Sequence, residues 1–170
     1  KLGWVGCCRI AKNHFDTIEF YKANIELKAI CDVDEKILRD LEERYKVNSY
    51  IDIVSMLDQE DLDLVILCTP SGIHAKQTIL CANHGVNVLT EKPMATSWSD
   101  GLRMVEACEA AGVRLFVVKQ NRRNPTLQLL KRAVKENRFG KIHMVHLNVF
   151  WTRPQEYYDQ ASWRGTWEMD

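Results

Sequence analysis

Two spacings of apolar residues alternate along most of the chain. Short runs with period-two or continuous hydrophobicity predict buried strands, and segments with apolar residues three and four apart predict helices. Six strands are expected, near residues 2–6, 25–31, 47–51, 62–68, 86–90 and 113–118. Because a helical segment follows most of these strands over a short connection, the pattern predicts an α/β fold with a doubly wound parallel sheet.

The pattern changes after Val118. A polar and basic stretch, residues 119–125, leads into a predicted helix that ends near Asn137, and residues 142–151 then read as a long alternating strand. Alternation without a following helix is typical of an antiparallel sheet. We therefore expect a first domain over residues 1–118 and the truncated start of an α+β antiparallel-sheet domain over residues 119–170. Since the chain starts at Lys1 inside a strand and stops at Asp170 without an ending signal, we expect a fragment of a longer protein.

Composition and charge exclude several classes of protein. Lys plus Arg and Asp plus Glu number 23 each, so no net field favours nucleic acid or an anionic membrane. The apolar runs are too short to span a bilayer. Six cysteines without C-x-x-C spacing suit small core residues in a reducing cytoplasm. His143 and His146 should face opposite sides of a strand, so we expect no metal site.

The first strand-to-helix turn is similar to a dinucleotide-binding Rossmann turn, G-x-G-x-x-G/A. Gly6 takes the first glycine position and Ala11 the small third position, but Cys8 replaces the second glycine, where a diphosphate would approach. We expect the turn to bind the cofactor through Gly6, Cys7, Cys8, Arg9 and Ile10.

Two acidic residues end the second predicted strand. A carboxylate there can accept a hydrogen bond from a ribose 2′-hydroxyl and repel a 2′-phosphate, which favours NAD over NADP. Either residue could instead only cap the next helix. We expect Asp34 to cap that helix and Asp32 to bind the ribose.

A charged pair, Glu91 and Lys92, stands between the fifth predicted strand and Pro93. Pro93 cannot continue the strand ladder, so the pair lies at the carboxyl end of the strand, the edge where α/β sheets bind ligands. A lysine partly withdrawn from water at this edge can exchange a proton with a substrate hydroxyl. The alternative is a solvated pair of loop charges.

These motifs, with Cys68-Thr69-Pro70-Ser71-Gly72-Ile73-His74 after the fourth strand, make the chain resemble the glucose-fructose oxidoreductase/inositol dehydrogenase/MocA family along essentially all of its length. Residues 150–158 and 163–167 are similar, more narrowly, to UDP-N-acetylglucosaminuronate 3-dehydrogenases of bacterial O-antigen synthesis. The resemblance implies an NAD-binding Rossmann domain and a catalytic Lys92 that contacts the hydroxyl being oxidised. It further implies a cofactor-binding role for Thr69, Pro70, Ser71, His74, Glu91, Lys92, Gln120, Trp163 and Arg164. A glycine-rich segment and a histidine beyond Asp170 should complete the site.

Aromatic residues gather between Phe150 and Asp170, interleaved with two arginines. Aromatic faces can stack on a uracil or sugar ring, and arginine forks match phosphate or carboxylate oxygens. We expect substrate contacts from Lys92, Arg153, Gln155, Tyr157 and Tyr158. An oligomer interface is an equal alternative, because interfaces favour the same residue types.

The combined expectation is a cytoplasmic NAD-dependent dehydrogenase that oxidises a secondary hydroxyl of a UDP-sugar, at C3, in lipopolysaccharide synthesis. A homo-oligomer is expected for the full-length protein. The rival hypotheses are another sugar or inositol dehydrogenase or reductase of the same family, a non-catalytic nucleotide-binding module, and a methyltransferase, which would leave Glu91 and Lys92 unexplained.

Overall fold

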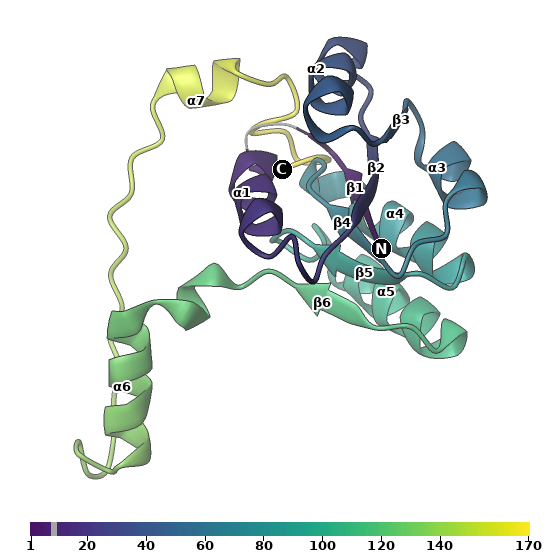
Figure 1. The fold of residues 1–170 in the computed structure, drawn as a ribbon. Helices are drawn as coiled ribbons and strands as arrows, with labels where there is room; N and C mark the ends of the chain where they lie inside the picture. The colour runs from purple at the N-terminus through teal and green to yellow at the C-terminus, as the bar shows by residue number, and fades with distance from the viewer. Residues whose placement is uncertain (8–9) are drawn as a thin grey trace. The chain divides into compact units, whose positions relative to one another are not determined.

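A computed structural model describes residues 1–7 and 10–170 of the chain (Figure 1). The chain divides into two compact units. The first comprises Lys1–Val118 together with Gly165–Asp170, and the second comprises Lys119–Arg164.

The described part of the first unit contains a parallel sheet of six strands. They are β1 (Leu2–Val5), β2 (Leu27–Cys31), β3 (Asn48–Tyr50), β4 (Leu64–Leu67), β5 (Asn87–Thr90) and β6 (Leu115–Val117). Their spatial order is β3-β2-β1-β4-β5-β6, and every neighbouring pair is parallel. This is the strand order of a dinucleotide-binding doubly wound sheet, so the predicted Rossmann fold is confirmed.

Helices cover both faces of this sheet. They are α1 (Ala11–Phe20), α2 (Glu35–Tyr45), α3 (Ile53–Gln59), α4 (His74–Asn83) and α5 (Trp98–Ala111), with a short 3-10 turn, η1 (Ser71–Ile73), before α4. The Asp34 carboxylate caps α2 as predicted, and the Ser97 hydroxyl caps α5. Local capping chemistry therefore sets where these two helices begin.

The core consists of two layers, one on each face of the sheet. Val65 and Leu67 of β4 pack in the layer that includes α3 and α4, whereas Ile66 and Cys68 pack in the layer that includes α1 and α2. This two-sided burial explains why β4 is a continuous apolar run. On the α1 side, the fully buried Trp4 ring stacks on Phe15 at a centroid distance of 4.7 Å. Each such buried side chain contributes roughly 1.5–3 kcal/mol, so α1 is firmly held against β1.

The second unit contains η2 (Gln120–Arg123), α6 (Pro125–Lys135) and α7 (Gln155–Asp159). Contrary to our expectation, residues 142–151 form no strand, and their large apolar side chains are exposed. A strand is stabilised by ladder hydrogen bonds, and the described residues of this unit offer no partner strand. The antiparallel-sheet domain stays a prediction.

The segment Gly165–Asp170 packs with the first unit. The backbone N–H of Gly72 donates to the carbonyl oxygen of Met169 at 3.1 Å. A β-carbon at Gly72 would collide with the backbone of Glu168. The absence of a side chain at position 72 is therefore what lets this segment reach η1.

Candidate functional site

The strand register brings the predicted site residues of the first unit to one edge of the sheet. It pairs Val5 with Cys31 and with Leu67, and Leu67 with Thr90. Because the strands are parallel, the next residue of each strand lies at the same carboxyl edge. These next residues are Gly6, Asp32, Cys68 and Glu91. The dinucleotide turn and the Glu91-Lys92 pair therefore share the edge where such sheets bind ligands.

Gly6 is a position that only glycine fits. Its φ is +86°, and a β-carbon there would lie 2.7 Å from the carbonyl carbon of Cys68 and 2.8 Å from the Thr69 nitrogen. The turn after β1 thus passes directly against the backbone at the end of β4. This close approach is what a dinucleotide-binding turn requires of its first glycine. Cys8 and Arg9, also predicted to bind the cofactor, lie outside the described residues.

Asp32 holds the described start of this turn in place. One carboxylate oxygen accepts the backbone N–H of Cys7 at 2.6 Å, and the other accepts that of Asp34 at 3.0 Å. Each carboxylate oxygen has two acceptor positions, so the pair can still accept a ribose hydroxyl. The acceptor oxygens of Asp32 fit the ribose of NAD, and the position without a side chain at Gly6 fits the approach of a diphosphate. Ile10, the last turn residue predicted to bind, is partly exposed directly before α1.

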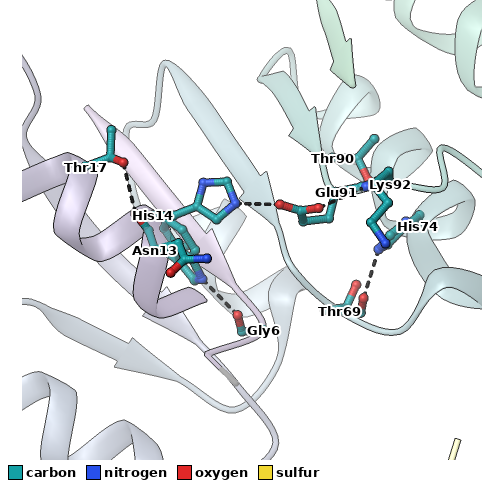
Figure 2. A network of polar contacts seen from close by, with 10 residues as sticks. Gly6, Asn13, His14, Thr17, Thr69, His74, Thr90, Glu91 and Lys92 are labelled. Carbon is teal, nitrogen blue, oxygen red and sulfur yellow. Dashed lines mark hydrogen bonds and ion pairs between the residues drawn. The ribbon is translucent and has the colours of Figure 1, made fainter. Parts of the chain in front are cut away.

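Glu91 forms the contact that links the two ends of the site. Its Oε1 lies 2.7 Å from Nε2 of His14 on α1, and its Oε2 accepts the backbone N–H of Lys92 at 3.2 Å (Figure 2). Burial raises the pKa of Glu91, but the hydrogen bonds from His14 and from the Lys92 backbone outweigh this effect and leave the pKa below its ordinary value. Glu91 is therefore an ionised, buried carboxylate.

His14 was not among the site residues predicted from the sequence. No short motif joins it to Glu91, since the two residues are 77 positions apart. The available signal was a histidine, rather than an apolar residue, on the core-facing side of a helix that starts at a dinucleotide turn.

Lys92 follows Glu91 and is exposed. We expected a lysine partly withdrawn from water, and the structure differs because the chain leaves the sheet after Thr90 and carries this side chain beyond the packed layers. The Lys92 ammonium makes no ion pair with an acid among residues 1–7 and 10–170. It is available to a ligand at this edge.

His74 joins two loops of the edge. Its ring is fully buried, with Nε2 2.9 Å from the carbonyl oxygen of Thr69 and Nδ1 2.9 Å from that of Pro93. Because both ring nitrogens already have protein partners, His74 is placed to hold these loops together. The Thr69 hydroxyl donates to Gln77, so it too has a protein partner, and Pro70 and the buried Ser71 form the turn between Thr69 and α4.

The remaining predicted residues belong to the second unit, where most of them form one cluster. The Arg153 guanidinium lies 4.8 Å from the centroid of the Tyr157 ring, and the Arg164 guanidinium lies 4.5 Å from it. Arg164 also lies 5.6 Å from the Trp163 ring, and Tyr158 packs edge-on against Tyr157. Two cations on one aromatic ring make a surface suited to an anionic, ring-containing ligand.

Two of the predicted residues of the second unit, Gln155 and Gln120, lie outside this cluster of arginines and aromatic rings. Gln155 donates to Asp159 within α7, and the exposed Gln120 begins η2.

Among residues 1–7 and 10–170, no three His, Cys, Asp or Glu side chains are grouped so that they could hold a metal ion. No described helix has both the length and the hydrophobicity needed to cross a membrane.

Two solved structures match nearly the whole chain. The WlbA dehydrogenase of Chromobacterium violaceum, solved with NADH and UDP-GlcNAcA, is 57% identical with a TM-score of 0.97, covering 99% of this chain and 49% of that one. The WlbA dehydrogenase of Bordetella pertussis, also solved with NADH and UDP-GlcNAcA, is 54% identical with a TM-score of 0.97, covering 99% and 52%.

More distant relatives act on other substrates. The D-apiose dehydrogenase of Paraburkholderia graminis is 33% identical over 82% of this chain and 37% of that enzyme. The myo-inositol 2-dehydrogenase of Thermotoga maritima is 30% identical over 86% of this chain and 44% of that enzyme. The chain thus spans about half the length of its solved WlbA relatives and less of these two enzymes.

The sequence profile of the Gfo/Idh/MocA family, an oxidoreductase family with an NAD-binding Rossmann fold, matches residues 1–119. The strand order, the turn at Gly6 and the position of the Glu91-Lys92 pair at the same edge of the sheet agree with this match. The chain belongs to the Gfo/Idh/MocA oxidoreductase family and carries its NAD-binding Rossmann fold.

Proposed function

We propose that the protein is an NAD-dependent dehydrogenase that oxidises the C3 hydroxyl of UDP-N-acetylglucosaminuronate to a 3-keto sugar, in bacterial lipopolysaccharide O-antigen synthesis. The observation that carries this proposal is the likeness to the two WlbA enzymes, which extends over 99% of the chain. The sugar and inositol dehydrogenases among its relatives support hydroxyl oxidation as the reaction type.

The first unit holds the cofactor in this proposal. Gly6 lets a diphosphate approach the turn after β1, and Asp32 accepts a ribose hydroxyl. Cys7, Cys8, Arg9 and Ile10 are assigned to cofactor binding with them. Since Asp32 is also close to where a 2′-phosphate would lie, its charge disfavours NADP. When bound, NAD supplies the hydride acceptor for the reaction. Thr69, Pro70, Ser71 and His74 shape the loop on the other side of the turn.

Lys92 moves the proton. Oxidation of a secondary alcohol removes a hydride from carbon and a proton from oxygen, and the Lys92 amine accepts or relays that proton. The position of Lys92 at the carboxyl edge of the sheet, where ligands bind, supports this role. Glu91 stays ionised beside it, because His14 and the Lys92 backbone stabilise the carboxylate.

The second unit supplies substrate contacts. The Arg153 and Arg164 guanidinium groups against Tyr157 support binding of a phosphate or carboxylate beside a ring. Tyr158, which packs against Tyr157, and Gln155, at the start of α7, are assigned to substrate binding as well. Gln120 and Trp163 are assigned to the nicotinamide end. A UDP-sugar acid offers both a diphosphate and a carboxylate to these two arginines.

The test uses the full-length protein and follows reduced nicotinamide by absorbance. UDP-N-acetylglucosaminuronate is compared with UDP-N-acetylglucosamine, which lacks the carboxylate, and with myo-inositol and D-apiose, each with NAD and NADP. Losing a hydrogen bond to a charged group costs about 1.5–3 kcal/mol, so kcat/KM should favour the sugar acid by about tenfold or more. Equal rates with inositol would refute the assigned substrate class.

A second variant tests the role of Lys92. Lys92→Met should lower kcat by about 10²- to 10⁴-fold, the usual contribution of a proton-transfer group, while NAD binding measured by calorimetry stays nearly intact. Lys22→Met, an exposed lysine in the connection between α1 and β2, serves as the matched control. Turnover of Lys92→Met at the control rate would remove lysine from the mechanism.

We place the protein in the cytoplasm, which the buried thiols of Cys31, Cys81 and Cys108, none of them in a disulfide, support. A homo-oligomer is proposed because α6 exposes Leu129, Leu130 and other apolar side chains that need cover. Light scattering of the full-length protein tests the assembly.

A further inference from the structure

The His14 side chain contacts Glu91, the acidic member of the Glu91-Lys92 pair. Its Nε2 is 2.7 Å from Oε1 of Glu91, and Figure 2 shows the two side chains pointing at each other from α1 and from the end of β5. An ionised carboxylate can only accept a hydrogen bond, so His14 Nε2 is the donor. The Trp4 ring meets the His14 ring edge-on at 5.2 Å, and Trp4 is itself fixed by its Nε1–H bond to the Gly6 carbonyl at 2.9 Å.

Glu91 has few alternative partners if this bond is lost. It is 7% exposed, and its backbone N–H donates to the Leu67 carbonyl at 2.9 Å, so its main chain cannot move away. A buried carboxylate that loses a side-chain donor is destabilised and is driven toward another cation. The adjacent candidate is the Lys92 ammonium, whose charge already acts on Glu91.

We propose that His14 is a positioning residue for proton transfer, and this inference rests on the proposed function. By holding the Glu91 side chain turned toward α1 (Figure 2), His14 keeps that carboxylate from turning to pair with the Lys92 ammonium. The Lys92 amine is thereby left free to meet the substrate hydroxyl. Through Trp4, the same contact joins the cofactor turn at Gly6 to the proton-transfer loop.

Two matched variants separate the donor from the imidazole. His14→Gln places an amide donor near the former Nε2 position, whereas the shorter His14→Asn ends near Nδ1 and cannot reach Glu91. We expect His14→Asn to lower kcat by about tenfold to hundredfold, the usual cost of a misplaced reacting group, with KM for NAD unchanged. His14→Gln should restore most of kcat.

A second measurement, the reactivity of the Lys92 amine, requires neither cofactor nor turnover. Brief labelling of amines, quantified by mass spectrometry on the full-length protein, compares Lys92 with the exposed Lys46 after α2 as an internal reference. Pairing with Glu91 should protect the Lys92 amine about two- to fivefold in His14→Asn, the range expected of an exposed ion pair. In a Glu91→Gln background the carboxylate is gone, so His14→Asn should change neither kcat nor labelling further.

Each outcome decides the proposal. Loss of kcat and of Lys92 labelling in His14→Asn, with rescue by His14→Gln, supports it. Wild-type labelling of Lys92 in His14→Asn, or equal loss of kcat in both variants, overturns it. If His14→Asn does not fold, His14→Ala provides the donor-free variant. If the wild-type protein shows no dehydrogenase activity, the proposed function fails, but the labelling ratio still decides the role of His14.

Discussion

Gly6 offers the sharpest test of how the fold builds the cofactor turn. An alanine there must adopt φ near +86°, which costs about 1–2 kcal/mol for a residue with a β-carbon. Its β-carbon would also lie 2.7–2.8 Å from three backbone atoms of Cys68 and Thr69, which cannot rotate away. Overpacking of this kind costs about 1–3 kcal/mol more. Gly6→Ala should therefore lower the free energy of unfolding by about 2–5 kcal/mol.

Two other glycines provide matched controls. Gly85 and Gly112 have φ of +73° and +69°, but a β-carbon at either would meet nothing within 4 Å. Gly85→Ala and Gly112→Ala should show only the conformational cost of about 1–2 kcal/mol. Urea unfolding followed by circular dichroism gives the free energy of unfolding of all three variants. Replacing glycine by alanine lowers the entropy of the unfolded chain equally in each, so this effect cancels in the comparison. An equal loss in all three variants would refute the close approach of the turn to the end of β4.

Three further predictions concern single side chains of the first unit. Asp34→Ala should cost about 1 kcal/mol in the same urea assay because two N–H groups of α2 lose their cap, whereas Asp34→Asn should retain most of it; equal losses would contradict the cap. Although burial raises the pKa of Glu91, the hydrogen bonds from His14 and a backbone N–H lower it below its ordinary 4.5, so the ionised group stabilises the fold above about pH 4.5. That contribution is lost as the pH falls through the folded-state pKa, and Glu91→Gln should flatten the acid side of the stability curve; parallel curves would argue against it. Burial raises the pKa of Cys81 to about 12, so iodoacetamide should label this thiol, as read by mass spectrometry, only as the protein unfolds; rapid labelling in native buffer would disprove its burial.

Local patterns in the sequence determined the elements of the first unit. Period-two and continuous apolar runs located its strands, with bounds that differ from the structure by a few residues at the ends. Asp34 located the start of α2 because a cap is a contact between near neighbours in the chain. The place of Glu91 and Lys92 at a strand end also follows from Pro93, one or two residues away.

The tertiary structure decided which of these local features meet. The bond between His14 and Glu91, and the His74 ring between the carbonyls of Thr69 and Pro93, depend on strand order and register. For residues 142–151 the alternating pattern was present, yet no strand formed, because a strand requires a partner that periodicity within one segment does not specify. A repeating pattern encodes the conformation of a segment, whereas contacts between segments arise only when the packed chain brings them together.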